Sequence, residues 1–407
     1  MEKSRTCAVV GQSGGPTSAI NATLCGVIAS CRSSGKISRL YGMRNGIEGF
    51  LKEDFVDLFS FFDSAPPLED LKHTPSSALG SCRARLPHFS QDVSVYERIF
   101  SVLDTHNIGY FFYIGGNDSM DTVAKLSEYA EETDSPVRFV GIPKTIDNDL
   151  CGTDHTPGYG SAAKLVATVT EEILRDCAVY TRDAVTVIEI MGRESGWLTA
   201  ACALCGAQNG KRVDLIYPPE IPFSRAEFIE DVKGALAKHP DVVIAVSEGL
   251  RYPNSEYVSK GEGEDCFGHS MLSGTARALC DIVRTQIGCK TRAIELNVLQ
   301  RCSAHILSAT DISESVLVGE ESVRLALEGE TGIMSAIERL DGEYKIKITS
   351  SDVKTVANKT KRLPRSFINE RGNGITDKGV DYILPLIQGE AHSRFENGMP
   401  IHYIFGN

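Results

Sequence analysis

The sequence predicts an α/β protein with two doubly wound, Rossmann-like domains whose sheets are parallel. The chain has 407 residues, which is enough for two domains of ordinary size. Short apolar runs bounded by loop residues recur along it, and helical patterns separate them. The runs are mostly continuous rather than alternating in polarity, as expected for strands that helices cover on both faces.

The expected elements follow in chain order. The apolar runs predict strands at residues 7–10, 110–114, 137–142, 184–190, 242–246 and 293–299. The clearest helical faces are formed by Ile20, Leu24, Val27 and Cys31 and by Leu165, Val169 and Ile173. We expect these two helices to begin near Thr17 and Ser161.

Composition and charge exclude several classes of protein. The net charge is −12, from 42 Lys and Arg against 54 Asp and Glu, and the sequence has no basic stripe, so nucleic-acid binding is not expected. The apolar runs are shorter than the ~18 residues of a membrane span, and the N-terminal segment predicts no signal peptide. The 12 cysteines are scattered, and we expect the CxxC pair, Cys202 and Cys205, to pack within a helical layer. Together these features predict a cytoplasmic location.

Glycine and charged residues follow each expected strand. Open α/β sheets bind ligands beyond the carboxyl ends of their strands, so we expect an active site along this edge. The segments are GQSGGP (11–16), GGNDS (115–119), PKTIDND (143–149), MGRE (191–194), SEG (247–249) and QR (300–301).

Two of these loops contain paired glycines. At Gly14 and Gly15, backbone N–H groups could approach a phosphate at a helix start, although a simple tight turn also explains them. The 115–119 loop repeats this pattern, and we expect Ser119 to N-cap a helix that runs through Leu126.

The PKTIDND segment is the sharpest chemical signal. Lys144, Thr145, Asp147 and Asp149 lie within six positions. Carboxylates beside a lysine are consistent with proton transfer next to a bound phosphate, whereas turn preference alone also accounts for the Asp and Asn residues.

Further charged residues could serve the same site. Arg193 and Glu248 follow two later strands and could hold a sugar phosphate, although ordinary salt bridges explain each one singly. His155 and His305 have no metal-ligand spacing, so we expect them to be ordinary polar residues. The remaining candidate cations are Arg83, Arg85, Arg292 and Arg301.

Taken together, PKTIDND, MGRESGW, GTDHTPGYGSA and SGGP with Asn21 resemble the phosphofructokinases over residues ~6 to ~330. The resemblance implies two doubly wound domains with the active site in the cleft between them. It also implies phosphoryl transfer to the 1-hydroxyl of fructose 6-phosphate. We expect a phosphoryl-donor domain of residues 1–152 plus about 303–350. The sugar-phosphate domain is then expected to comprise residues 153–302 plus about 351–407.

Asp118 and Lys144 indicate the phosphoryl donor. ATP-dependent members of this family have glycine at both positions, so the chain resembles the pyrophosphate-dependent branch. Asp118 would oppose ATP by charge and bulk, and Lys144 would compensate charge on the smaller pyrophosphate. We expect a reversible glycolytic reaction.

The resemblance also implies residue roles. Asp147 would be the base for the 1-hydroxyl, Lys144 and Arg193 would stabilise the moving phosphoryl group, and Mg2+ would bridge donor oxygens. Arg292 would bind the 6-phosphate, in relatives often from a neighbouring subunit, which implies a homodimer or homotetramer. The donor-binding residues would be Gly15, Arg83, Asp118 and Lys144. The sugar-phosphate residues would be Thr145, Asp147, Asp149, Met191, Gly192, Arg193, Glu248, Arg292, Val298 and Arg301.

The chain departs from the family pattern at three positions. Asn117 replaces an aspartate associated with Mg2+, so it offers only a weak metal contact. Val298 stands where relatives often have His or Tyr, and Ala184 where many ATP-dependent relatives have Arg. Both changes concern the 6-phosphate pocket, so sedoheptulose 7-phosphate is an alternative acceptor.

Two other functions stay open, an ATP-dependent phosphofructokinase and, more remotely, a non-catalytic phosphate-sensing subunit. A basic cluster beyond residue ~340 matches the family less well and could cover the active site or join subunits. Its members are Lys359, Lys361, Arg362 and Arg365.

Overall fold

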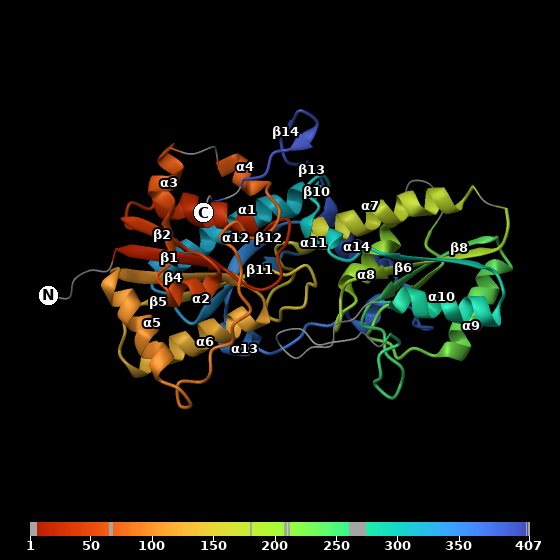
Figure 1. Cartoon of the computed structure of the whole chain (residues 1–407), viewed down its shortest axis with the longest axis horizontal. Helices are drawn as coiled ribbons and strands as arrows, with labels where there is room; N and C mark the ends of the chain where they lie inside the picture. Colours follow the sequence, from red (N-terminus) through yellow and green to blue (C-terminus); the bar gives the residue numbers. More distant parts are fainter. Residues whose placement is uncertain are drawn as a thin grey trace.

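A computed structural model describes residues 6–64, 68–179, 181–206, 210, 212–259, 274–403 and 405. It confirms the predicted α/β class, with a seven-stranded sheet in one half of the molecule and a four-stranded sheet in the other (Figure 1). Helices cover both faces of each sheet, so the continuous apolar runs of the sequence lie between helical layers.

The seven-stranded sheet is parallel at its centre and antiparallel at both edges. Successive residues of β1 and β4 point to opposite layers: Val10 and Phe112 join one core cluster, and Val9 and Phe111 join the other. In spatial order the strands are β12 (Ile346–Asp352), β11 (Ile333–Arg339), β5 (Arg138–Pro143), β4 (Ile108–Gly115), β1 (Cys7–Gln12), β2 (Arg39–Met43) and β3 (Phe55–Asp57).

Two groups of helices enclose this sheet. One face is covered by α1 (Ile20–Ser33), α3 (Leu58–Ser64), α4 (Leu68–Lys72) and α12 (Ala309–Leu327). The other is covered by α2 (Gly46–Leu51), α5 (Ser94–Thr105), α6 (Asn117–Glu132) and α13 (Val353–Val356).

The four-stranded sheet is entirely parallel. Its strands are β7 (Leu215–Tyr217), β8 (Asp241–Ser247), β6 (Ala184–Ile190) and β9 (Lys290–Glu295). One face carries α7 (Tyr159–Cys177), α8 (Trp197–Ala201), η1 (Cys202–Leu204), η2 (Arg365–Phe367), α14 (Asp377–Ile383) and η3 (Leu384–Ile387). The other face carries α9 (Arg225–Leu236) and α10 (Thr275–Gln286).

Short elements complete the described chain. The helix α11 (Leu299–Cys302) follows β9, and β10 (Leu307–Ser308) pairs with β13 (Glu390–Ala391). A final hairpin consists of β14 (Phe395–Glu396) and β15 (Met399–Pro400). Within the described ranges, no helix is both long and apolar enough to span a membrane.

Three predicted boundaries were wrong. The strand expected at 293–299 ends at Glu295, because Asn297 turns the chain with a left-handed φ of 46° before α11 begins. Ser119 does not cap α6; Gly116 is the N-cap, and Ser119 is buried in the first turn. The first helix begins at Ile20 rather than near Thr17.

The C-terminal segment reaches the seven-stranded half. Arg394 pairs with Asp70 at 2.9 Å, and the aromatic ring of Phe405 lies 4.9 Å from that of Phe61. These contacts differ from the expected assignment of residues 351–407 to the sugar-phosphate domain. The other domain boundaries remain predictions, and the pair Cys202 and Cys205 is buried in the helical layer beside α7.

Helices α1 and α12 approach each other closely through glycine. A Cβ atom on Gly26 would overlap the carbonyl oxygen of Val316, and one on Gly319 would overlap that of Thr23. Neither backbone can yield without moving a whole helix, so glycine is required at this crossing.

We expect Gly26→Ala to lower the free energy of unfolding by about 1–3 kcal/mol, although alanine favours an isolated helix. The matched control is Gly234→Ala in α9, where an added Cβ meets nothing within 4 Å. Thermal unfolding measures both. Equal midpoints for the two variants would contradict the proposed close approach.

Candidate active site

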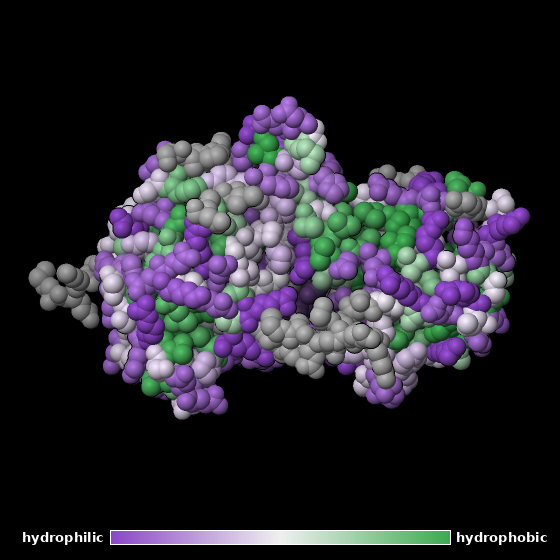
Figure 2. Space-filling view, viewed as in Figure 1, coloured by the Kyte–Doolittle hydropathy of each residue, from purple (hydrophilic) through white to green (hydrophobic). Residues whose placement is uncertain are grey.

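A cleft lies where the carboxyl ends of strands from both sheets face each other. On the face drawn in Figure 2, hydrophilic side chains border a hollow between the two halves of the molecule. The loops after β1, β4 and β5 line the cleft from one side, and those after β6 and β8 line it from the other. The predicted site residues on its walls are Gly15, Arg83, Asn117, Asp118, Lys144, Thr145, Asp147, Asp149, Met191, Arg193, Glu248 and Arg301.

Lys144 is buried against the glycine loop. Its Nζ donates to the carbonyl oxygen of Gly15 at 2.7 Å and lies 3.2 Å from the place where a Cβ on Gly14 would be. Gly14 also has a left-handed φ of 77°, so glycine suits this position on two counts. Burial lowers the pKa of Lys144 to about 8, and the charges of Asp147 and Asp149 oppose that shift.

Asp147 and Asp149 lie on one short loop after β5. The backbone N–H of Asp147 donates to Oγ1 of Thr145 at 3.1 Å, and Asn148 turns the chain with a left-handed φ of 50°. Within the described chain, Oδ1 of Asp147 is buried without a hydrogen-bond partner. Burial raises the pKa of both carboxyls, and for Asp147 the nearby charges of Asp149 and Glu248 raise it further.

Asp118 is held inside the cleft by an arginine. Nε and Nη2 of Arg85 lie 3.0 and 2.9 Å from its Oδ1, so the carboxylate is fixed beside the glycine loops. The preceding residue, Asn117, begins α6, and its Oδ1 is buried without a partner among the described residues. An orphaned oxygen in a cleft is free to accept a bond from a bound ligand.

The opposite wall is organised by Glu248. Its Oε1 accepts from the backbone N–H of Gly192 at 3.5 Å, and the N–H of Met191 donates to Oε1 of Gln300 at 3.1 Å. Burial raises the pKa of Glu248 to about 7 despite the opposing charge of Arg193. These contacts fix the MGR loop at the edge of the cleft.

Two predicted residues lie elsewhere in this chain. Arg292 lies on β9 by a separate cavity near the start of that strand, and its Nη1 donates to Oδ2 of Asp176 at 2.7 Å. The side chain of Val298 is 50% exposed and is not part of the cleft wall. Within one subunit, neither residue reaches the ligand site that was expected to include it.

Several cleft residues were missed by sequence reasoning. Arg251 lies three positions after Glu248 and bonds both Glu194 and Tyr257, and that short spacing could have revealed it. Asn358 and Thr360 come from the basic C-terminal cluster region, and only the folded chain brings them to the cleft.

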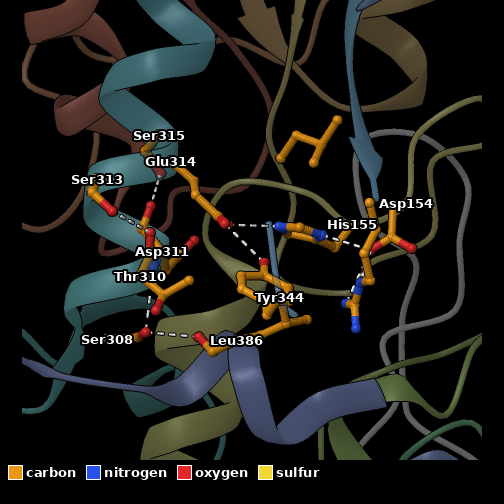
Figure 3. A network of polar contacts seen from close by, with 12 residues as sticks. Asp154, His155, Ser308, Thr310, Asp311, Ser313, Glu314, Ser315, Tyr344 and Leu386 are labelled. Carbon is orange, nitrogen blue, oxygen red and sulfur yellow. Dashed lines mark hydrogen bonds and ion pairs between the residues drawn. The ribbon is translucent and has the colours of Figure 1, made fainter. Parts of the chain in front are cut away.

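Beside the cleft, the buried His155 joins two carboxylates. Its Nδ1 lies 2.8 Å from Asp154, and its Nε2 lies 2.7 Å from Glu314 of α12, which also accepts from Oη of Tyr344 (Figure 3). Burial lowers the pKa of His155, but these two partners outweigh burial and raise it. Across the described ranges no three His, Cys, Asp or Glu side chains gather as metal ligands.

Comparison with known proteins agrees with this geometry. The family model described as Phosphofructokinase matches residues 7–326. The chain belongs to the phosphofructokinase family. A relative from Halomonas elongata, named pyrophosphate–fructose 6-phosphate 1-phosphotransferase, is 42% identical over 96% of this chain and 93% of its own length.

Two further comparisons concern a solved structure and a second relative. A crystal structure of the pyrophosphate-dependent phosphofructokinase from Nitrosospira multiformis superposes with a TM-score of 0.89 at 37% identity. That match covers 98% of this chain and 96% of the other. A sulfofructose kinase from Alkalicoccus urumqiensis is 31% identical over 89% of this chain and 92% of its own length.

Asp147→Asn should stabilise the fold increasingly as pH rises. The folded state raises the pKa of this carboxyl, so ionisation penalises folding above its ordinary pKa and costs nothing below it. We expect a gain on the order of 2 kcal/mol at pH 8 that shrinks toward pH 4. Thermal unfolding across this range measures it, with the exposed Asp341→Asn as control. A gain independent of pH would contradict this origin.

Proposed function

We propose that this phosphofructokinase transfers a phosphoryl group reversibly from pyrophosphate to the 1-hydroxyl of fructose 6-phosphate, giving fructose 1,6-bisphosphate and phosphate. Pyrophosphate is chosen as the donor because Asp118 and Lys144 occur together in the cleft. The names of the relatives from Halomonas elongata and Nitrosospira multiformis support it. We place the reaction in glycolysis and the protein in the cytoplasm.

Donor selection follows from charge and space. Arg85 holds the Asp118 carboxylate in the cleft, where it would repel the α-phosphate of ATP and obstruct its nucleoside. Pyrophosphate lacks the nucleoside, and the ammonium of Lys144 compensates its charge. Arg83 and the backbone N–H of Gly15 also line the cleft and bind pyrophosphate. The N–H of Gly14 does not take part, because it already donates to the carbonyl oxygen of Cys82 at 3.1 Å.

Asp147 acts as the general base. As the 1-hydroxyl oxygen attacks one phosphorus of pyrophosphate, its proton passes to Asp147 and a P–O bond forms to the sugar. The bond from that phosphorus to the bridging oxygen breaks, and the bridging oxygen leaves with the second phosphate. The raised pKa of this carboxyl suits a base that must accept a proton. Lys144 and Arg193 stabilise charge on the moving group, and Thr145 and Asp149 orient the hydroxyl.

Mg2+ fits this cleft as a donor-bound ion. The buried orphan oxygens of Asn117 and Asp147 can accept bonds from metal-bound water, and oxygen is the ligand that Mg2+ prefers. Few protein oxygens would hold the ion, as is usual when Mg2+ is carried on phosphates. When bound, it neutralises charge on the donor.

We infer that a neighbouring subunit helps to bind the acceptor's phosphate. Arg301 lines the cleft, whereas Arg292 and Val298 lie outside it. We propose a homodimer or homotetramer in which Arg292 serves the neighbouring cleft. Because the side chain of Val298 cannot hydrogen-bond a phosphate, sedoheptulose 7-phosphate stays the alternative acceptor.

Initial rates with Mg2+ and fructose 6-phosphate test the donor. We expect turnover with pyrophosphate and little with ATP. Replacing both residues, Asp118→Gly with Lys144→Gly, should raise the rate with ATP and lower it with pyrophosphate, and each single variant should do less. Turnover with ATP alone would instead indicate an ATP-dependent phosphofructokinase.

Asp147→Ala should lower kcat by about 10²–10⁴-fold, because the base is lost while the binding residues remain. Isothermal titration should still detect fructose 6-phosphate binding. An unchanged kcat would remove Asp147 from the role of base. A wild-type chain that binds both ligands without turnover would instead indicate a phosphate-sensing subunit.

A further inference from the structure

The C-terminal segment 358–363 runs directly against the loop that carries Asp147. It lies beyond residues 7–326, the part that the phosphofructokinase family model matches. The backbone N–H of Lys361 donates to the carbonyl oxygen of Asp149 at 2.7 Å, and Leu150 and Thr360 form an antiparallel bridge. The segment therefore supports the catalytic loop from outside the matched region.

The ammonium of Lys361 bonds one side chain of this loop and two backbone carbonyls just after it. Its Nζ donates to Oδ1 of Asn148 at 3.1 Å and to the carbonyl oxygens of Thr153 and Asp154 at 3.1 and 2.6 Å. An ammonium has three protons, and each has a partner here. The lysine is also anchored at its backbone, where its carbonyl oxygen accepts from Nε1 of Trp197 at 3.1 Å.

Asn148 is the loop residue whose side chain bonds Lys361. It lies between the two cleft aspartates with a φ of 50°, a conformation that side chains other than glycine adopt at some cost. Its Oδ1 accepts from Lys361, and its Nδ2 donates to Oη of Tyr382 at 3.3 Å. Both bonds hold the turn that sets the direction of the Asp147 side chain.

The acceptors of Lys361 are themselves fixed. The Asp154 carboxylate is hydrogen-bonded to His155 and accepts from Nε of Arg339 at 3.1 Å, and His155 is tied to Glu314 of α12 (Figure 3). Tyr382 donates through Oη to the Asp154 carbonyl oxygen at 2.6 Å. The loop is thus connected through Lys361 to the rigid elements β11, α12 and α14.

We infer that Lys361 is a positioning residue, which holds Asn148 and the loop 145–149 so that Asp147 meets the acceptor hydroxyl. This inference rests on the proposed function, in which Asp147 is the base. Lys361 does not line the cleft, so it acts through the loop rather than on a ligand. Small misplacements of a catalytic group can reduce rates by about 100-fold.

Lys361→Met tests this role, with Lys359→Met as the matched control because Lys359 is exposed in the same segment. We expect kcat to fall about 10–100-fold in the first variant. The KM values for both substrates should stay within about threefold. The control should match the wild type. An unchanged kcat, or a raised KM with kcat preserved, would overturn the inference. The assay uses whichever donor the wild type turns over, so failure with pyrophosphate contradicts only the proposed function.

Hydrogen exchange gives a readout independent of turnover. Amides of residues 145–150 should exchange faster in Lys361→Met than in the control, and unchanged exchange would overturn the role. If Lys361→Met does not fold, Asn148→Gly removes the acceptor while tolerating the left-handed turn. It should lower kcat with Lys361 intact. Where both variants fold, the double variant should be no slower than Lys361→Met alone, and multiplicative losses would contradict a shared mechanism.

Discussion

The burial of like charges on the loop after β5 is the constraint on which the rest of the site depends. Asp147 and Asp149 lie two residues apart on one buried loop, and Glu248 adds a third acidic group. Such an arrangement is costly unless cations and hydrogen bonds surround it. Lys144, Arg193 and the backbone of the TIDND turn supply these, and the glycine loop leaves room for the lysine.

The same constraint explains why two sheets are needed. One sheet edge can present the acidic loop and the glycine loops, but the arginine and glutamate that face them come from the other sheet. Side chains bond the backbone of each wall. Lys144 donates to the carbonyl oxygen of Gly15 on one side. On the other side, the N–H groups of Met191 and Gly192 donate to Gln300 and Glu248. The cleft is therefore preorganised on both sides before any ligand arrives.

Much of this arrangement could be predicted from the sequence, because central strands are continuous apolar runs and their ends carry distinctive loops. All six expected strands are present, although the last ends earlier than expected, and most expected site residues line one cleft. Outer strands were missed: β12, at one edge, alternates in exposure, and β2, next to the other edge, contains Arg39 and Gly42. Contacts across distant segments, such as Lys361 on Asn148, leave no local pattern, and the position of Arg292 depends on tertiary structure.

The chain passes between the two halves more than once: after β5, after α11, after α13 and again before the C-terminal contacts with Asp70 and Phe61. A protein joined by one linker separates into two pieces when a protease cuts that linker. Here the two fragments would still be held together, because each contributes helices to a shared core. The packing of α1 on α12 and of α7 beside α14 would stay intact. A single nick should thus leave a non-covalent complex that co-purifies as one particle and comes apart only in denaturant.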